Sequence, residues 1–146
     1  MAYFKVNTLW RDEQYYRNTE TGQYMPKYVL ILAISTDADD ALGAVLTSKS
    51  NGLSEHPACD FGPPRAGYFL GTPGGPLTLP TWVDFSSIQD QESLSFKRRI
   101  ASGRLRQVDV WLHAALFCKV LRCLSQSEDL SRRQHKWLAD TLQKLG

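Results

Sequence analysis

The chain has 146 residues, of which 42% are hydrophobic, and it contains no long low-complexity tract. This is enough apolar sequence for one core, so we expect a single domain over residues 1–146. The formal net charge of +2 is too small to argue by itself for nucleic acid or for an anionic membrane. No apolar run approaches the roughly 20 residues that span a bilayer, and the first residues lack the pattern of an export signal. We therefore expect a soluble, cytoplasmic protein with no membrane partner.

The three cysteines are Cys59, Cys118 and Cys123. Their odd number and their spacing match no common disulfide scaffold or zinc ribbon, so we expect reduced thiols. Cys118 and Cys123 are expected to pack as small apolar groups in a helical part. His56 and Cys59 have ligand-like spacing, but zinc needs two further ligands and the remaining histidines and cysteines lie far along the chain. We expect no metal and no cofactor.

Two apolar segments form the centre of the predicted fold. Residues 26–35 (PKYVLILAIS) are an apolar run that ends at an acidic turn, and residues 43–48 (GAVLTS) are a second, shorter run. Runs without alternation suit buried strands in the middle of a sheet. If the two strands pair as a hairpin, the start of the first lies beside the end of the second. This pairing would place Lys27 next to Thr47 and Ser48.

The segments around this pair predict further strands and loops. Rough alternation predicts a first strand over residues 3–10, and the polar residues 11–25 predict a mobile loop. Glycines and prolines predict turns through residues 49–67, followed by short strands over 68–70 and 80–85. Short strands joined by such turns are typical of a small barrel or a strongly curled sheet.

The last third of the chain has helical periodicity. Apolar residues recur at helical intervals from Gln107, which predicts a helix over residues 107–124. A second helix is predicted over 131–145, where Ser131 and Gln134 have the spacing of a capping box. Two helices packed on one face of the sheet would close the core.

The expected fold class is therefore β-rich α+β, with a barrel over about residues 1–90 and two C-terminal helices over about residues 105–146. Four segments resemble, in their order along the chain, the MazF/PemK/Kid group of toxins. They are PKYVLIL, a strand ending in LTS, TWVDFSSI, and SGRL before an amphipathic helix. The resemblance covers residues 3 to about 124. The helix over 131–145 looks like an extension beyond the usual family length.

This resemblance implies a small SH3-like, PemK-like barrel that is related to the gyrase poison CcdB. It also implies an mRNA interferase, that is, a metal-independent endoribonuclease that cuts single-stranded RNA through a 2′,3′-cyclic phosphate. The implied partners are RNA, an antitoxin protein and a second copy of the chain in a homodimer.

The family motif transfers to this sequence only in outline. The arginine that follows the first loop in the family falls on Lys27, and the proline after it is replaced by Tyr28. The family's Thr-Ser pair falls on Thr47 and Ser48, of which Thr47 would donate a hydrogen bond to a phosphate oxygen. Replacing a forked guanidinium by an ammonium weakens bidentate binding of a phosphate.

The acidic residue of the later strand falls on Asp84, the expected base, and Lys27 is its expected electrostatic partner. An arginine that some members carry two positions earlier is Trp82 here, which alternation places on the same side of the strand as Asp84. An RNA 2′-hydroxyl attack needs a base, an acid and cations for the phosphorane charge. Further cations such as Arg65 or Arg98 would have to arrive by folding or from the second copy.

Residues 97–106 carry five cations and no acid, which makes this stretch a candidate contact for the RNA backbone. With Ser48 and Trp82, its arginines Arg98, Arg99 and Arg104 form the predicted RNA-binding set. The same stretch is compatible with a solvated loop and the start of a helix.

Each candidate also has an ordinary structural interpretation. Lys27 can be a solvated charge, and Thr47 and Ser48 can form the turn after a strand. Asp84 can pair with a nearby arginine, and Trp82 can serve packing rather than base stacking.

Two further functions therefore stay open. One is a non-catalytic binding module on the same barrel, which the lysine and tryptophan at the family's arginine positions favour. The other is a CcdB-like toxin that binds a topoisomerase.

Overall fold

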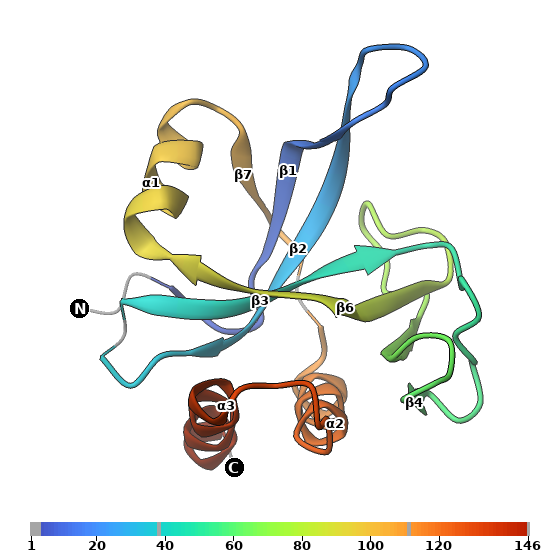
Figure 1. Ribbon diagram of the computed structural model, residues 1–146, viewed down its shortest axis with the longest axis vertical. Coiled ribbons are helices and arrows are strands. Elements are labelled where there is room, and N and C mark those ends of the chain that lie inside the picture. Colours follow the sequence, from blue (N-terminus) through green and yellow to red (C-terminus); the bar gives the residue numbers. More distant parts are fainter. Residues whose placement is uncertain (1–3, 38, 111, 146) are drawn as a thin grey trace.

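One antiparallel sheet forms the centre of the computed structural model, which describes residues 4–37, 39–110 and 112–145 (Figure 1). The strands lie in the order β4-β5-β6-β3-β2-β1-β7. Three helices complete the β-rich α+β fold, and its class agrees with the prediction. The strands are β1 (Leu9–Arg17), β2 (Tyr24–Ile34), β3 (Asp40–Thr47), β4 (Cys59–Asp60), β5 (Gly67–Gly71), β6 (Thr81–Glu92) and β7 (Leu105–Val108). The helices are α1 (Ser93–Ala101), α2 (Ala114–Leu124) and α3 (Arg132–Leu145).

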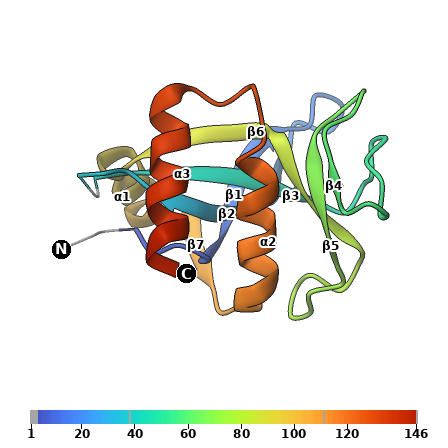
Figure 2. The same ribbon diagram turned by 90° about the horizontal axis from the view of Figure 1, so that it is seen from below.

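The main core lies between one face of the sheet and the helices α2 and α3. Figure 2 shows these two helices side by side across the strands. Leu30 and Val83 from the sheet and Leu121 and Leu138 from the helices are at most 1% exposed in this cluster. Burial of a leucine side chain contributes about 1.5–3 kcal/mol, so this cluster dominates the folding free energy.

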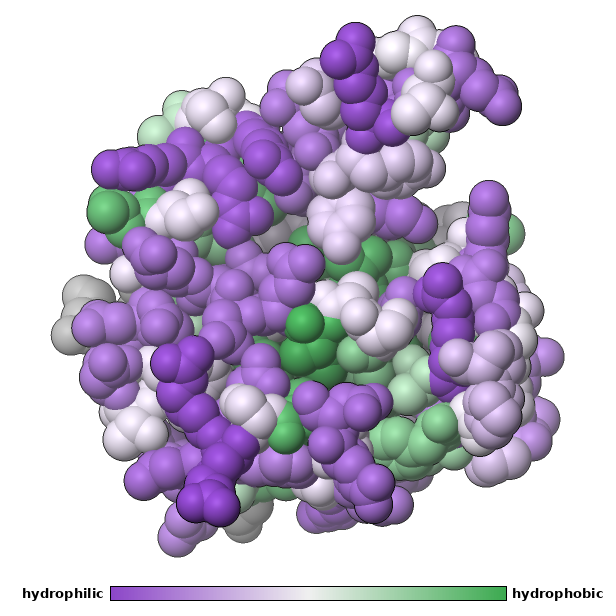
Figure 3. Space-filling view, in the orientation of Figure 1, coloured by the Kyte–Doolittle hydropathy of each residue, from purple (hydrophilic) through white to green (hydrophobic). Residues whose placement is uncertain are grey.

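The opposite face of the sheet carries a smaller core beneath α1. Phe96 of α1 packs edge-on against Phe4 and Trp10, with ring centroids 4.9 Å apart in both pairs. Val29 pairs with Val45, and Val45 with Asp84, so these three residues share this second face. We call it the open face, because α2 and α3 do not cover it. The β1–β2 hairpin projects from the body, and Figure 3 shows a hollow with hydrophobic residues at its floor between this hairpin and the chain around β4.

The first strand differs from its prediction. β1 begins at Leu9 and continues to Arg17, so a strand occupies much of the predicted mobile loop over residues 11–25. β1 lies between β2 and β7, and its charged side chains find partners there, such as Arg11, which donates to the Tyr28 hydroxyl of β2 at 3.3 Å. The polarity that indicated a loop is therefore the polarity of a strand that is only partly covered.

The chain between β6 and α2 also differs from its prediction. The strand predicted over 80–85 continues to Glu92, and helix α1 then takes up part of the basic stretch 97–106. Residues 105–108 form β7, which pairs with β1, so the predicted helix over 107–124 begins only at Ala114. The apolar positions at the start of the predicted helix thus belong to a strand and a connection, which short windows do not distinguish from a helix.

Helix α3 confirms both its predicted position and its predicted cap. Ser131 Oγ accepts a hydrogen bond from the Gln134 backbone N–H, and Gln134 Oε1 accepts one from the Ser131 N–H, both at 3.0 Å. These reciprocal bonds are those of a capping box.

The expectation of reduced thiols is wrong for two of the three cysteines. Cys59 of β4 forms a disulfide with Cys123 of α2, and only Cys118 is a free thiol. The two cysteines are 64 positions apart, so no local window of the sequence indicates this pairing. The fold creates it by packing α2 against β5, the strand that pairs with β4.

Candidate functional site

Lys27, Thr47 and Ser48 come together as the predicted hairpin requires. The antiparallel register of β2 and β3, in which Tyr28 pairs with Leu46, sets the start of one strand beside the end of the other. All three residues line a cleft of about 220 Å³, which the chain from Pro76 to Thr81 borders. We call it the strand-end cleft.

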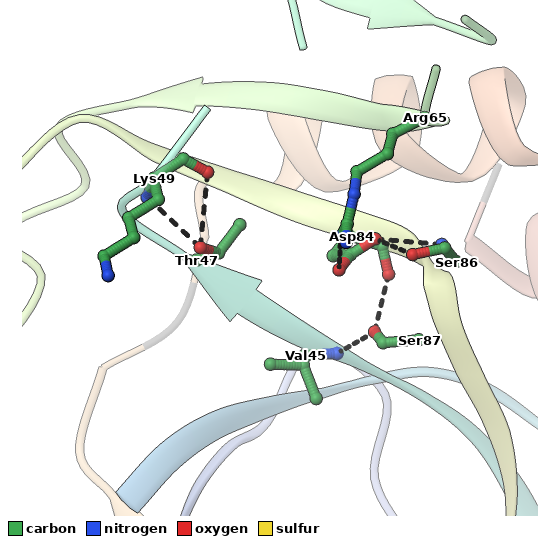
Figure 4. Close-up of polar contacts among 7 residues, drawn as sticks. All are labelled: Val45, Thr47, Lys49, Arg65, Asp84, Ser86 and Ser87. Carbon is green, nitrogen blue, oxygen red and sulfur yellow. Dashed lines mark hydrogen bonds and ion pairs between the residues drawn. The ribbon is translucent and has the colours of Figure 1, made fainter. Parts of the chain in front are cut away.

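The hydroxyl of Thr47 is engaged within its own turn. Thr47 Oγ1 accepts a hydrogen bond from the Lys49 N–H at 3.1 Å and donates one to the Lys49 carbonyl at 3.3 Å (Figure 4). These bonds form the strand-end turn that was the ordinary interpretation of this residue. A phosphate oxygen would have to replace the Lys49 carbonyl as the acceptor.

Asp84 is held by an arginine that arrives from a distant loop. Arg65, just before β5, donates from Nη1 to Asp84 Oδ2 at 3.2 Å, and Asp84 Oδ1 accepts from the Ser86 N–H and the Ser86 hydroxyl (Figure 4). The Arg65 side chain is 43% exposed and that of Asp84 is 14% exposed. This confirms the ordinary interpretation, in which Asp84 pairs with an arginine. It also supplies a forked cation next to the predicted base.

A bulge fixes the backbone beneath this pair. The pairing of β3 with β6 shifts register between Gly43 and Val45. Ser87 Oγ bridges the gap, because it accepts from the Val45 N–H at 2.8 Å and donates to the Asp84 carbonyl at 2.6 Å. Bulges of this kind re-aim side chains next to functional sites.

Lys27 and Asp84 do not lie in one cleft. Lys27 is opposite Thr47 by register, and Thr47 pairs with Trp82, so Lys27 lies two strands and two residues from Asp84. Ordinary strand spacing makes their Cα atoms roughly 12 Å apart. Arg65, and not Lys27, is the cation that contacts Asp84.

Trp82 is 6% exposed, and its geometry fits the packing interpretation. Its Nε1–H donates to the Ser54 carbonyl at 3.0 Å, and its ring lies 4.9 Å from that of Phe69. Little of the indole surface is available for stacking on a base.

The basic stretch divides into an exposed and an internal part. Arg98 is exposed on α1, whereas Arg99 and Arg104 turn toward Asp12 of β1. Arg104 donates to both Asp12 oxygens, from Nε at 2.9 Å and from Nη2 at 3.2 Å, and Arg99 Nη1 lies 3.9 Å from Oδ2. These residues line a pocket of about 290 Å³ beneath α1, which we call the α1 pocket. Its lining consists of Asp12, Tyr15, Val29, Gly43, Ala44, Val45, Ser87, Gln89, Gln91, Arg99 and Arg104.

Asp12 and Tyr15 are site residues that the sequence did not reveal. Strict alternation would place them on opposite faces of β1, but a register shift between Asp12 and Tyr16 interrupts the strand. Burial raises the pKa of Tyr15, and the nearby charges of Asp84 and Asp12 raise it further. Tyr15 thus lines the α1 pocket, and its phenol is protonated at neutral pH.

Among residues 4–37, 39–110 and 112–145, no three histidine, cysteine or acidic side chains are grouped so that they could bind a metal ion. Within the same ranges, no helix has the length and apolar character needed to cross a bilayer. Among the described residues, most of the predicted site residues lie in the strand-end cleft, the Asp84–Arg65 pair and the α1 pocket. Comparison of the chain with protein-family models and with curated proteins finds no match.

Proposed function

We propose that the chain is a toxin-like, metal-independent endoribonuclease that cuts single-stranded RNA, acts in the cytoplasm as a homodimer and is restrained by an antitoxin. The observation that supports this proposal best is the Asp84–Arg65 pair, which combines a carboxylate with a forked cation on the open face. The resemblance of the sequence to the MazF/PemK/Kid group, which assigns Asp84 as the base, also supports it.

The proposed reaction uses the 2′-hydroxyl of the RNA as the nucleophile. Asp84 takes the 2′-hydroxyl proton, the 2′-oxygen forms a bond to phosphorus, and the bond from phosphorus to the 5′-oxygen breaks. The Tyr15 phenol gives its proton to the leaving 5′-oxygen, and the proton on Asp84 returns to Tyr15 through water. The products are a 2′,3′-cyclic phosphate and a 5′-hydroxyl, with no net change in protons.

The cations have separate roles in this scheme. Arg65 shifts from Asp84 to the scissile phosphate, where its fork stabilises the charge of the phosphorane and leaves the carboxylate free to accept a proton. Lys27 and Ser48, in the strand-end cleft, contact a neighbouring phosphate of the same strand. Positioned proton transfer typically contributes about 10²–10⁴-fold to such a rate.

The test is incubation of the purified protein with a long single-stranded RNA in the presence of EDTA, followed by mapping of the new ends. We expect discrete cuts that Asp84→Asn and Arg65→Ala reduce at least about 100-fold. Asp90→Asn is the matched control, because Asp90 is also an ion-paired acid of β6, with Arg133 at 2.7 Å. Intact RNA with wild-type protein whose circular dichroism shows a folded state, or cuts that persist in Asp84→Asn, would refute the catalytic proposal.

A non-catalytic binding module is the second candidate. It is favoured by the engagement of Thr47 with Lys49 and of Asp84 with Arg65, because these two of the three predicted catalytic groups, which also included Lys27, are already satisfied within the chain. This candidate predicts that RNA binds and stays intact, and that Asp84→Asn leaves its affinity unchanged within about twofold.

A further inference from the structure

The α1 pocket has a cationic wall that one carboxylate only half neutralises. Arg99 and Arg104 both approach Asp12, which is 1% exposed. Two guanidinium charges and one carboxylate leave the wall with a net charge of about +1. The Asp12 side chain is only 2% exposed and faces Arg104, so its main role is to orient the two arginines.

The hydrogen bonding of Arg99 is incomplete within the described residues. Its Nη2 donates to Gln91 Oε1 at 2.7 Å, but its Nε is buried and has no hydrogen-bond partner. A buried donor without an acceptor costs about 1–3 kcal/mol. Burial also lowers the pKa of Arg99. The positive charge of Arg104 lowers it further, whereas the negative charge of Asp12 raises it. An anion beside the accessible part of the Arg99 guanidinium would favour its charged form.

The remaining lining limits the size and the kind of ligand. The floor includes Val29, Gly43 and Val45, and the volume of about 290 Å³ is at the lower end for small-molecule sites. A Cβ atom on Gly43 would come within 3.2 Å of both Gln91 Cγ and Val29 Cγ1, so the glycine allows this close packing. An apolar floor beside a cationic wall suits one nucleotide, which has a ring and a phosphate.

The pocket is contiguous with the proposed cleavage centre. Ser87 lines the pocket, and its hydroxyl donates a hydrogen bond to the Asp84 carbonyl. Tyr15 also lines the pocket, and the charge of Asp84 contributes to raising its pKa. An RNA strand whose scissile phosphate lies at Asp84 can therefore place an adjacent nucleotide in the pocket.

We propose that the α1 pocket binds one phosphodiester group of the RNA through Arg99 and Arg104, which Asp12 holds in position. This inference rests on the proposed function for the identity of the ligand. The net charge of about +1 matches the single negative charge of a phosphodiester, and the forked geometry of arginine suits its oxygens. Asp12 is thus a positioning residue, and the two arginines are the contacts.

Binding of an uncleavable strand tests this proposal apart from catalysis. The probe is a fluorescent oligonucleotide of ten 2′-deoxynucleotides, which lacks the attacking hydroxyl, and the readout is anisotropy over a range of salt concentrations. We expect Arg99→Gln to weaken binding about 10- to 100-fold and to reduce the slope of log affinity against log salt by about 0.7, the value for one phosphate contact on a single strand. Arg99→Lys should keep the slope and recover only part of the affinity.

Arg122→Gln is the matched control, because it removes the same charge from an exposed position on α2. Equal affinities and equal salt slopes for Arg99→Gln and Arg122→Gln would overturn the proposal. Asp12→Asn removes the negative charge of the wall, yet we expect weaker binding because the arginines lose their orientation. Stronger binding would refute the positioning role. If Asp12→Asn does not fold, Arg99→Gln and Arg99→Lys alone test whether the pocket binds a phosphate.

Competition with inorganic phosphate and with a nucleoside monophosphate identifies the source of the phosphate. We expect neither to displace the oligonucleotide at 1 mM. Displacement by the monophosphate that Arg99→Gln abolishes would overturn the assignment to RNA in favour of a free nucleotide. Because the probe cannot be cut, loss of RNA cleavage in the test of the proposed function leaves this result unaffected.

Discussion

Reduction of the bond between Cys59 and Cys123 should lower stability by an amount that follows from its place in the chain. The bond closes a loop between residues 64 apart. The chain-entropy relation for a loop of that length gives about 4 kcal/mol of stabilisation at 25 °C, through restriction of the unfolded chain. Domains of this size are stable by roughly 5–15 kcal/mol, so this loss is a large part of the total.

The assay is urea unfolding of the oxidised protein, of the protein in dithiothreitol and of a Cys59→Ala/Cys123→Ala double variant. We expect the midpoint to fall by more than about 1 M urea in the second and third samples. Cys118→Ala is the control, since Cys118 is the free thiol, and its response to dithiothreitol should equal that of the wild type. Identical free energies of unfolding with and without reductant, or non-reducing peptide maps in which Cys59 and Cys123 are separate thiols, would refute the reasoning.

Two further predictions concern a helix cap and alkaline pH. Ser131→Ala removes one hydrogen bond of the capping box and should destabilise the protein by about 1 kcal/mol in urea unfolding. The control Ser95→Ala, within α1, should change the free energy of unfolding by less than half of that amount. Equal effects of the two substitutions would argue against the cap. The pKa of Tyr15 is raised in the folded state, so its contribution is complete below its unfolded pKa of about 10 and is lost as the pH rises through the folded value. Unfolding at pH 8 to 11 should therefore show a steeper fall for the wild type than for Tyr15→Phe, and parallel profiles would contradict the placement of Tyr15.

The elements that the sequence predicted are those with local determinants. The apolar run of β2 and the capping box of α3 are contained within a few residues, and both occur where they were expected. β1 and β7 pair across about two thirds of the chain, through pairs such as Leu9 with Val108. Their periodicity is weak because each is covered by a partner that no local window contains.

The candidate site divides in the same way. The hairpin register predicted that Lys27 and Thr47 would be neighbours, because it depends on two adjacent strands. The partner of Asp84 could not be chosen from the sequence, since Arg65 reaches it from a loop without regular structure. Asp12 was hidden by a bulge that interrupts the alternation of β1.

The pairing of β1 with β7 has a consequence for the order of folding during synthesis. Asn7 fastens the chain just before β1 to the start of the helical part, because its side chain donates to the Leu112 carbonyl at 2.8 Å and accepts from the Leu112 N–H at 3.1 Å. These partners are 105 residues apart. During synthesis, the edge of β1 that pairs with β7 therefore stays unpaired until the last third of the chain has left the ribosome. The charged side chains of Arg11, Glu13 and Arg17 along β1 protect this unpaired edge, because charges on an exposed strand edge oppose pairing with other nascent chains.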